Sequence, residues 1–162
     1  MTNNDLLVQT AKIVTGLDSI VPSSSTPDYV SLKNYGKLTA VILVKNATTV
    51  TGSAITLKQA TAVAGTSEKA LSFSTVWANT DTGATDTLVK TTVSSDTFTT
   101  DATNSKNLMY VIEVDAADLD VANGFDCVRV GTGNATAATV TVLYLLRSPR
   151  YAQATLPSAI VD

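Results

Sequence analysis

Histidine is absent from this chain of 162 residues, and cysteine occurs once. The absence of histidine removes the commonest general base and the commonest zinc ligand, while a single cysteine cannot form an internal disulfide. No stretch approaches the roughly 20 apolar residues that cross a bilayer, and the first residues lack the basic and apolar segments of a signal peptide. We therefore expect a cytoplasmically made protein that is no enzyme and has no metal, cofactor or membrane partner.

Charged residues are also scarce. They make up 15% of the chain, the net charge is -3, and the isoelectric point is about 4.8. Such a chain offers no basic surface for phosphates, so we expect no direct nucleic-acid partner. Hydrophobic residues reach 44%, largely as Ala and Val, and Thr is frequent, which favours strands over helices. A chain of this length fits one domain that buries roughly 70% of its unfolded surface.

Proline and serine residues divide the chain into three parts. Residues 1–28 hold a weakly apolar stretch, with a short helix possible over 4–14, and then VPSSSTPD, whose two prolines interrupt any regular element. Residues 29–147 contain short apolar runs separated by turn residues, and residues 148–162 again carry two prolines. We expect a β-domain over 29–147 between an extended N-terminal arm and an extended C-terminal arm.

The apolar runs of the middle part have the length and spacing of β-strands. Eight or more recur at about ten-residue intervals without a helix-length segment between them, which is typical of an all-β, two-layer antiparallel β-sandwich, jelly-roll-like in form. LTAVILVK (38–45) and TVTVLYLLR (139–147) are apolar on both faces. We expect them to be central strands with both faces covered, one of the two faces by another subunit. In SFSTVWA (72–78), alternation places Phe73 and Trp77 on one face, which we expect to be buried.

The one cysteine lies between two charged residues in GFDCVRV (124–130). Strand alternation directs Cys127 to the same face as Phe125, and the chain has no histidine to activate its thiol. Buried cysteine behaves as a small hydrophobic side chain. We therefore interpret Cys127 as an inert core residue rather than as a nucleophile.

Four aspartates gather in the segment VDAADLDVANGFD, and they suggest a calcium site: Asp115, Asp118, Asp120 and Asp126. The segment lacks the ligand order and the closing glutamate of an EF-hand loop. Aspartate and asparagine also open turns by bonding their own backbone, and this segment joins two strong strand patterns. We interpret it as a turn and keep a structural cation as the alternative.

Aromatic residues leave a second class of function open, because β-sandwiches often bind sugars through exposed rings. Trp77 and the five tyrosines are dispersed along the chain, and Tyr110 and Tyr144 lie inside apolar runs, as core residues do. A row of exposed aromatic side chains on one sheet would favour a carbohydrate-binding module, which we keep as an alternative.

Four long segments resemble small virion structural proteins of tailed bacteriophages, of the capsid decoration or cement type: VSLKNYGKLTAVILV, LKQATAVAGTSEKAL, MYVIEVDAADLDVANGFDCVRV and RSPRYAQATLPSAIVD. The resemblance covers roughly residues 30–162. It implies a β-sandwich that assembles in symmetric copies on the outside of a capsid and stabilises contacts between major capsid proteins. A tail or fibre protein of the virion is a further alternative.

The two arms suit this role, because extended segments add strands or apolar anchors to neighbouring molecules. A specific contact needs roughly 800 Å² from each partner, more than one flat sheet face readily supplies. We expect two partners, the major capsid protein and the protein itself as a homodimer or homotrimer, on the capsid surface of a virion made in the host cytoplasm. The candidate interface residues are the larger apolar side chains of the arms: Leu6, Leu7, Ile13, Val14, Tyr151, Leu156, Ile160 and Val161.

Overall fold

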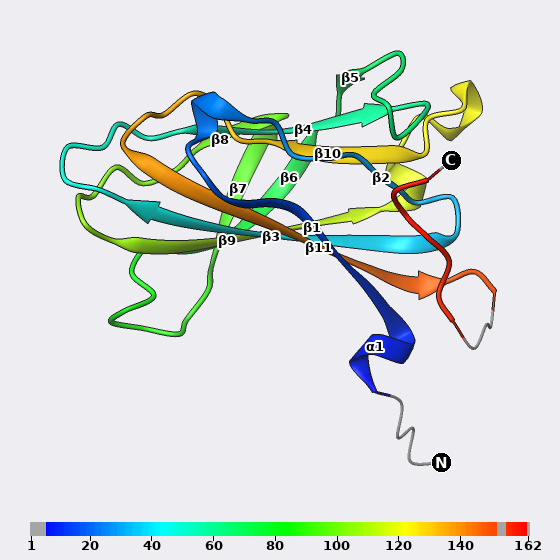
Figure 1. The fold of residues 1–162 in the computed structure, drawn as a ribbon, viewed down its shortest axis with the longest axis horizontal. Coiled ribbons are helices and arrows are strands. Elements are labelled where there is room, and N and C mark those ends of the chain that lie inside the picture. Colours follow the sequence, from blue (N-terminus) through cyan, green and yellow to red (C-terminus); the bar gives the residue numbers. More distant parts are fainter. Residues whose placement is uncertain (1–5, 152–154, 162) are drawn as a thin grey trace.

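The computed structural model describes residues 6–151 and 155–161. Within these ranges the chain forms eleven strands, one four-residue helix and three short 3-10 helices. The strands form two antiparallel sheets that pack face to face (Figure 1). The predicted all-β, two-layer antiparallel sandwich is thus confirmed.

The larger sheet has six strands in the order β1-β11-β3-β9-β6-β7. Their bounds are Ala11–Ile20 for β1, Tyr35–Asn46 for β3, Phe73–Asn79 for β6, Val89–Ser95 for β7, Asn107–Asp115 for β9 and Ala138–Pro149 for β11. β3 and β11 contain the two runs predicted to be central, and each has a neighbouring strand on both sides. β1 and β7 form the two edges of this sheet.

The smaller sheet has the order β2-β10-β4-β5, and β8 pairs with β4 beside this path. Its strands are β2 Val30–Ser31, β4 Ala54–Ala60, β5 Lys69–Ala70, β8 Thr97–Thr99 and β10 Cys127–Gly131. The helices are α1 Leu7–Thr10, η1 Pro22–Ser24, η2 Ala116–Asp118 and η3 Val121–Asn123. α1 lies outside the sandwich, just before β1 (Figure 1).

The core lies between the two sheets. Alternate residues of β3 from Leu38 to Val44 are at most 2% exposed, and they pack in one cluster with the inner residues of β4 and β10. Tyr144 of β11 is fully buried in this cluster, and its hydroxyl accepts a hydrogen bond from the backbone N–H of Val130 at 2.9 Å. Because Val130 belongs to the smaller sheet, this bond joins the two layers.

Residues 11–20 differ from the prediction, because they form an edge strand of the larger sheet and not part of an extended arm. β1 pairs with β11 along its length, with register shifts on either side of Leu17. Each shift changes which side chains point inward, so the segment shows poor apolar periodicity in the sequence. Gly16 lies at the first shift, where a Cβ atom would approach Cε2 of Tyr144 to 2.3 Å. Only glycine therefore allows this close approach of strand and ring.

The C-terminal segment also contacts the sandwich, although it was predicted as an extended arm. The backbone N–H of Ser31 donates to the carbonyl oxygen of Ala159 at 2.7 Å. The hydroxyl of Tyr35 donates to the carbonyl oxygen of Pro157 at 2.6 Å. Ala159 is fully buried in the main core. These contacts anchor residues 157–159 beside β2.

Strand β6 places its tryptophan on the opposite face from the one predicted. The pairing of β6 with β7 has a register shift between Phe73 and Thr75. Beyond this shift Val76 points into the core and is 2% exposed, while Trp77 points outward and is 39% exposed. Phe73 still packs against the core, where it meets the ring of Phe98 edge-on. The prediction that Trp77 is buried was wrong, because at this end of β6 the core-facing side chains are those of Val76 and Ala78.

Candidate functional site

The larger sheet buries one face against the core and directs its other face, here called the outer face, away from the smaller sheet (Figure 1). Outward positions of such a sheet are usually polar when water covers them. Here eight apolar side chains from five neighbouring strands lie together, and we call them the outer-face patch: Ile13, Val41, Leu43, Trp77, Met109, Val111, Leu143 and Leu145.

The strand register arranges the patch in rows. The middle row crosses the sheet from Leu143 through Val41 and Val111 to Trp77, each residue directly opposite the next. Ile13 and Trp77, near the two ends of the patch, are 47% and 39% exposed, and the other members are half-buried. The two runs that are apolar on both faces thus contribute one face to the core and the other to this patch.

Charged residues border the patch at the end where β9 finishes. Lys37 and Asp115 form an ion pair of 3.3 Å, and Arg147 and Glu113 form one of 2.6 Å. Lys45 lies exposed at the opposite end of β3. An apolar centre with a charged rim is the arrangement found in protein–protein interfaces.

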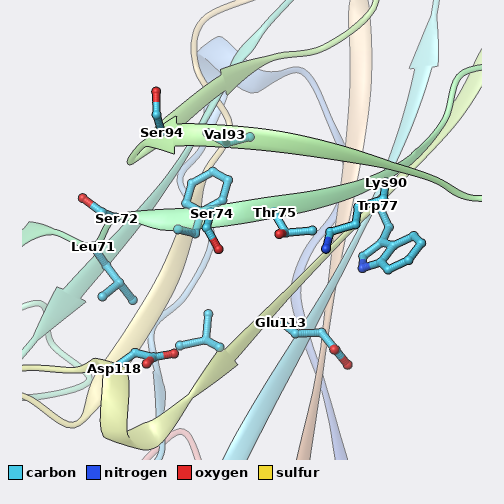
Figure 2. A pocket seen from close by; sticks show the side chains of 12 residues that line it. Leu71, Ser72, Ser74, Thr75, Trp77, Lys90, Val93, Ser94, Glu113 and Asp118 are labelled. Atoms are coloured by element: carbon cyan, nitrogen blue, oxygen red, sulfur yellow. The ribbon is translucent and has the colours of Figure 1, made fainter.

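A hollow of about 650 Å³ lies at the Trp77 end of the patch. It forms because β6 pairs with β9 only between Trp77 and Asn79, so that the first half of β6 diverges from β9. Figure 2 shows Trp77 and Lys90 on the side of β6 and β7, and Glu113 and Asp118 on the side of β9 and η2. Serine and threonine hydroxyl groups of β6 line the floor between them.

The carboxylates of this hollow already have protein partners. Glu113 accepts hydrogen bonds from Arg147 and Thr39, and Asp118 accepts one from the backbone N–H of Asp115 at 3.1 Å. The exposed indole of Trp77 offers an apolar plane and an N–H donor. This arrangement is suited to stacking and hydrogen bonding with a partner.

The predicted interface residues of the N-terminal segment are mostly exposed. Leu6, Leu7 and Ile13 are 64%, 56% and 47% exposed. Val14 instead packs against the core, because it pairs with the inward-pointing Tyr144. Among the C-terminal residues, Tyr151, Ile160 and Val161 are exposed and Leu156 is half-buried. Their role in an interface stays a prediction.

The fold brings the two terminal segments together. Val8, Ala11 and Ile13 line one hollow of about 320 Å³ together with Thr155 and Leu156. Ile13 and Leu156 were both predicted as interface residues, but nothing in the sequence showed that they would meet. Val8 was missed, although it is 66% exposed and extends the apolar sequence LLV.

A cluster on the smaller sheet has a structural role. The carboxylate of Glu68 accepts hydrogen bonds from Lys58, from Arg129 at 2.6 and 3.0 Å, and from the hydroxyl of Tyr29 at 2.6 Å. Burial and the bond to Glu68 raise the pKa of Tyr29 to about 12. These groups, here called the Glu68 cluster, attach the loop at 61–68 to β4 and β10.

Cys127 is fully buried close to this cluster, as predicted. It packs with Tyr29 and Ala60 in a small second core, and its thiol donates to Oδ1 of Asp126 at 3.1 Å. Burial keeps the sulfur away from any dissolved substrate, so the position of Cys127 suits a packing role.

The acidic segment forms turns. The carboxylate of Asp120 accepts hydrogen bonds from Lys69 and from the side-chain amide of Asn123, and Gly124 takes the left-handed conformation with a φ of 79°. Among the described residues, no three histidine, cysteine, aspartate or glutamate side chains group as a metal site requires. The turn interpretation accounts for the positions of these aspartates.

The fold defines the class of the protein as a two-layer antiparallel β-sandwich. No family model and no curated protein matches the sequence. A crystal structure of the SPBc2 prophage-derived protein YomS aligns with a TM-score of 0.47 and 17% identity, over 85% of this chain and 93% of that chain. In the part of the chain that the structure describes, no helix has the length and apolar character to span a membrane.

Proposed function

We propose that the chain is a structural protein of a bacteriophage virion that attaches to the capsid and stabilises contacts between major capsid proteins. The observation that carries the proposal is the outer-face patch, whose member Ile13 also lines one hollow with the exposed Val8 of the N-terminal segment. The sequence resemblance to decoration proteins supports the same role.

A surface of this kind suits a protein that acts by attachment. A decoration protein must contact several neighbours at once, and effective concentration then strengthens contacts that are individually weak. The patch and the apolar terminal segments supply adjoining contact areas on one molecule. The proposal assigns no catalytic activity to the chain.

Mass spectrometry of purified virions from the phage that encodes the chain tests this proposal. We expect the protein in an amount comparable to that of the major capsid protein. Capsids from a phage in which the gene is deleted should lose their DNA at a lower temperature than wild-type capsids. Gold-labelled antibodies should mark the head. Label confined to the tail would favour the fibre alternative, and absence from the virion would contradict a virion role.

One observation favours a second candidate function, which is carbohydrate binding. Trp77 is exposed beside hydroxyl groups, Lys90 and Glu113, a combination that can stack on and hydrogen-bond to a sugar ring. Trp77 is the one tryptophan of the chain, so a glycan that binds here should change the intrinsic fluorescence. A glycan-array screen, followed by titration calorimetry with the glycans that bind, tests this function. Trp77→Ala is the control, and it should abolish the heat of binding.

A further inference from the structure

We infer that the outer-face patch binds the same patch of a second copy of this chain, so that two sandwiches pack through their larger sheets. The inference rests on the proposed function in one respect, because it names the surface for the self-association expected of a virion protein. A second copy is the occupant that the strand register and the charges favour.

The register defines a twofold arrangement. Outer-face residues of β3 lie directly opposite their counterparts on β9, including Val41 opposite Val111 and Leu43 opposite Met109. A twofold axis parallel to the strands and midway between β3 and β9 places Val41 of each copy on Val111 of the other. Facing sheets in sandwiches pack about 10 Å apart with strand directions within about 30° of each other, a range that includes this aligned arrangement.

The same axis matches the outer strands of the patch. Leu143 of β11 and Trp77 of β6 occupy the two ends of the middle row, at similar distances from the axis. Leu143 of each copy therefore meets the indole of Trp77 of the other copy. This contact would cover Trp77, which is 39% exposed in the single chain.

Charges at the rim are complementary under this axis. Lys37 and Asp115 are opposite each other in the register, and their side chains are 53% and 51% exposed. The axis brings Lys37 of each copy over Asp115 of the other, which joins two ion pairs into one group of alternating charge. At the other end it places Lys45 over the neutral Asn107. No like charges of β3 and β9 are brought together.

The size of the patch agrees with a dimer interface. Five strands spaced by about 4.8 Å give a width of about 24 Å, and three rows of outward residues give a length of about 20 Å. The area of the outer face that the patch spans, polar positions such as Thr39 and Thr141 included, therefore measures about 480 Å² on each copy. Two copies bury about 1,000 Å² through this area, which is the lower limit for a specific interface.

Analytical ultracentrifugation of the full chain from about 1 to about 200 µM tests the inference. We expect a concentration-dependent dimer, with a blue shift of the Trp77 emission over the same range because the indole leaves water. Val41→Lys should raise the dimer dissociation constant at least tenfold, whereas Thr48→Lys adds the same charge in the exposed turn after β3 and should leave it unchanged. If Val41→Lys does not fold, Val41→Thr keeps the shape and should weaken the dimer in the same direction.

A charge exchange tests the orientation of the two copies. Lys37→Glu and Asp115→Lys should each weaken the dimer, and the double variant should restore it. A monomeric wild-type chain at the highest concentration, or a Val41→Lys dimer as strong as the wild type, would overturn the inference. A monomer that is still incorporated into virions would overturn this inference alone, while a dimer absent from virions would contradict only the proposed function.

Discussion

At the scale of single side chains, Glu68 couples the fold to pH. Partial burial would raise the pKa of its carboxyl group, but hydrogen bonds from Lys58, Tyr29 and Arg129 outweigh this effect and lower the pKa to about 2. A carboxyl group with a lowered pKa stabilises the fold above its unfolded pKa, which is about 4.3. That contribution is lost as the pH falls from about 4.3 through the folded value of about 2.

We predict that Glu68→Gln lowers the free energy of unfolding by about 1 to 2 kcal/mol at neutral pH, allowing for solvent screening of this partly exposed group. The difference from the wild type should shrink as the pH approaches about 2, because the wild-type carboxylate then also loses its charge. Urea denaturation over this pH range measures both effects. Asp86→Asn, in an exposed loop, should change the stability by less than about 0.5 kcal/mol. A difference between Glu68→Gln and the wild type that is independent of pH would contradict the role of the charge.

Cys127 gives a second prediction for a single residue. Because its side chain is fully buried beneath Tyr29, a thiol reagent should react only after local opening of β10. We expect modification of the native protein to be at least about a hundredfold slower than that of the urea-unfolded chain. Thr48→Cys adds an exposed thiol and should label at once at that position. Rapid labelling of the native wild type would show that the thiol is accessible.

Residue positions were predictable where strands are regular and not where they are irregular. Cys127 and Tyr144 lie in regular strands, and alternation placed both in the core. Trp77 lies opposite in alternation to Val76 and Ala78, and both faces of this strand carry large apolar side chains, so the sequence did not show which face is buried. The one aromatic side chain of the outer-face patch was therefore assigned to the wrong face.

At the scale of elements, β1 forms one edge of the larger sheet. It covers the edge of β11, and Leu17 reaches the main core from it. We predict that deletion of residues 1–10 changes the thermal unfolding midpoint little, because α1 has no buried residue. Deletion of residues 1–20 should instead yield aggregated protein, since it exposes the backbone of β11 and the ring of Tyr144.

Thermal unfolding and size-exclusion chromatography of the two truncated chains measure this difference. The chain that starts at residue 11 serves as the control for the chain that starts at residue 21. Equal stability of both chains would restore the original prediction that the folded domain begins near residue 29.

The regular strands could be predicted because their burial pattern follows their sequence. β3, β9 and β11 alternate between buried and outward residues along most of their length. β1 does not, because its two register shifts mix polar and apolar residues on each face. The sequence therefore predicted the interior of the larger sheet and missed one of its edges.

At the scale of the whole molecule, the C-terminal segment closes the fold near β2. We predict that deletion of residues 160–162 has little effect, whereas deletion of residues 157–162 lowers the free energy of unfolding by about 2 to 3 kcal/mol. The longer deletion removes buried Ala159 and leaves the buried hydroxyl of Tyr35 without the acceptor that Pro157 provides. Urea denaturation measures the difference, and equal stability of the two truncated chains would contradict the anchoring role.

The candidate surfaces could be predicted in kind but not in place. The sequences of β3 and β11 are apolar on both faces, which predicts a covered outer face. The meeting of Ile13 with Leu156 depends on strand pairing between the two ends of the chain, which local patterns do not encode. Likewise, the hollow beside Trp77 results from the divergence of β6 and β9.

The pairing of β1 with β11 also determines when this surface comes into existence during synthesis. β1 leaves the ribosome more than a hundred residues before β11, and it has no other strand partner among the described residues. The nascent chain must therefore carry an unpaired first strand until β11 has also been made, and such distant pairings make folding slow. Because Ile13, Leu143 and Leu145 belong to these two strands, the patch is incomplete until β11 has left the ribosome, and association through it must wait until then.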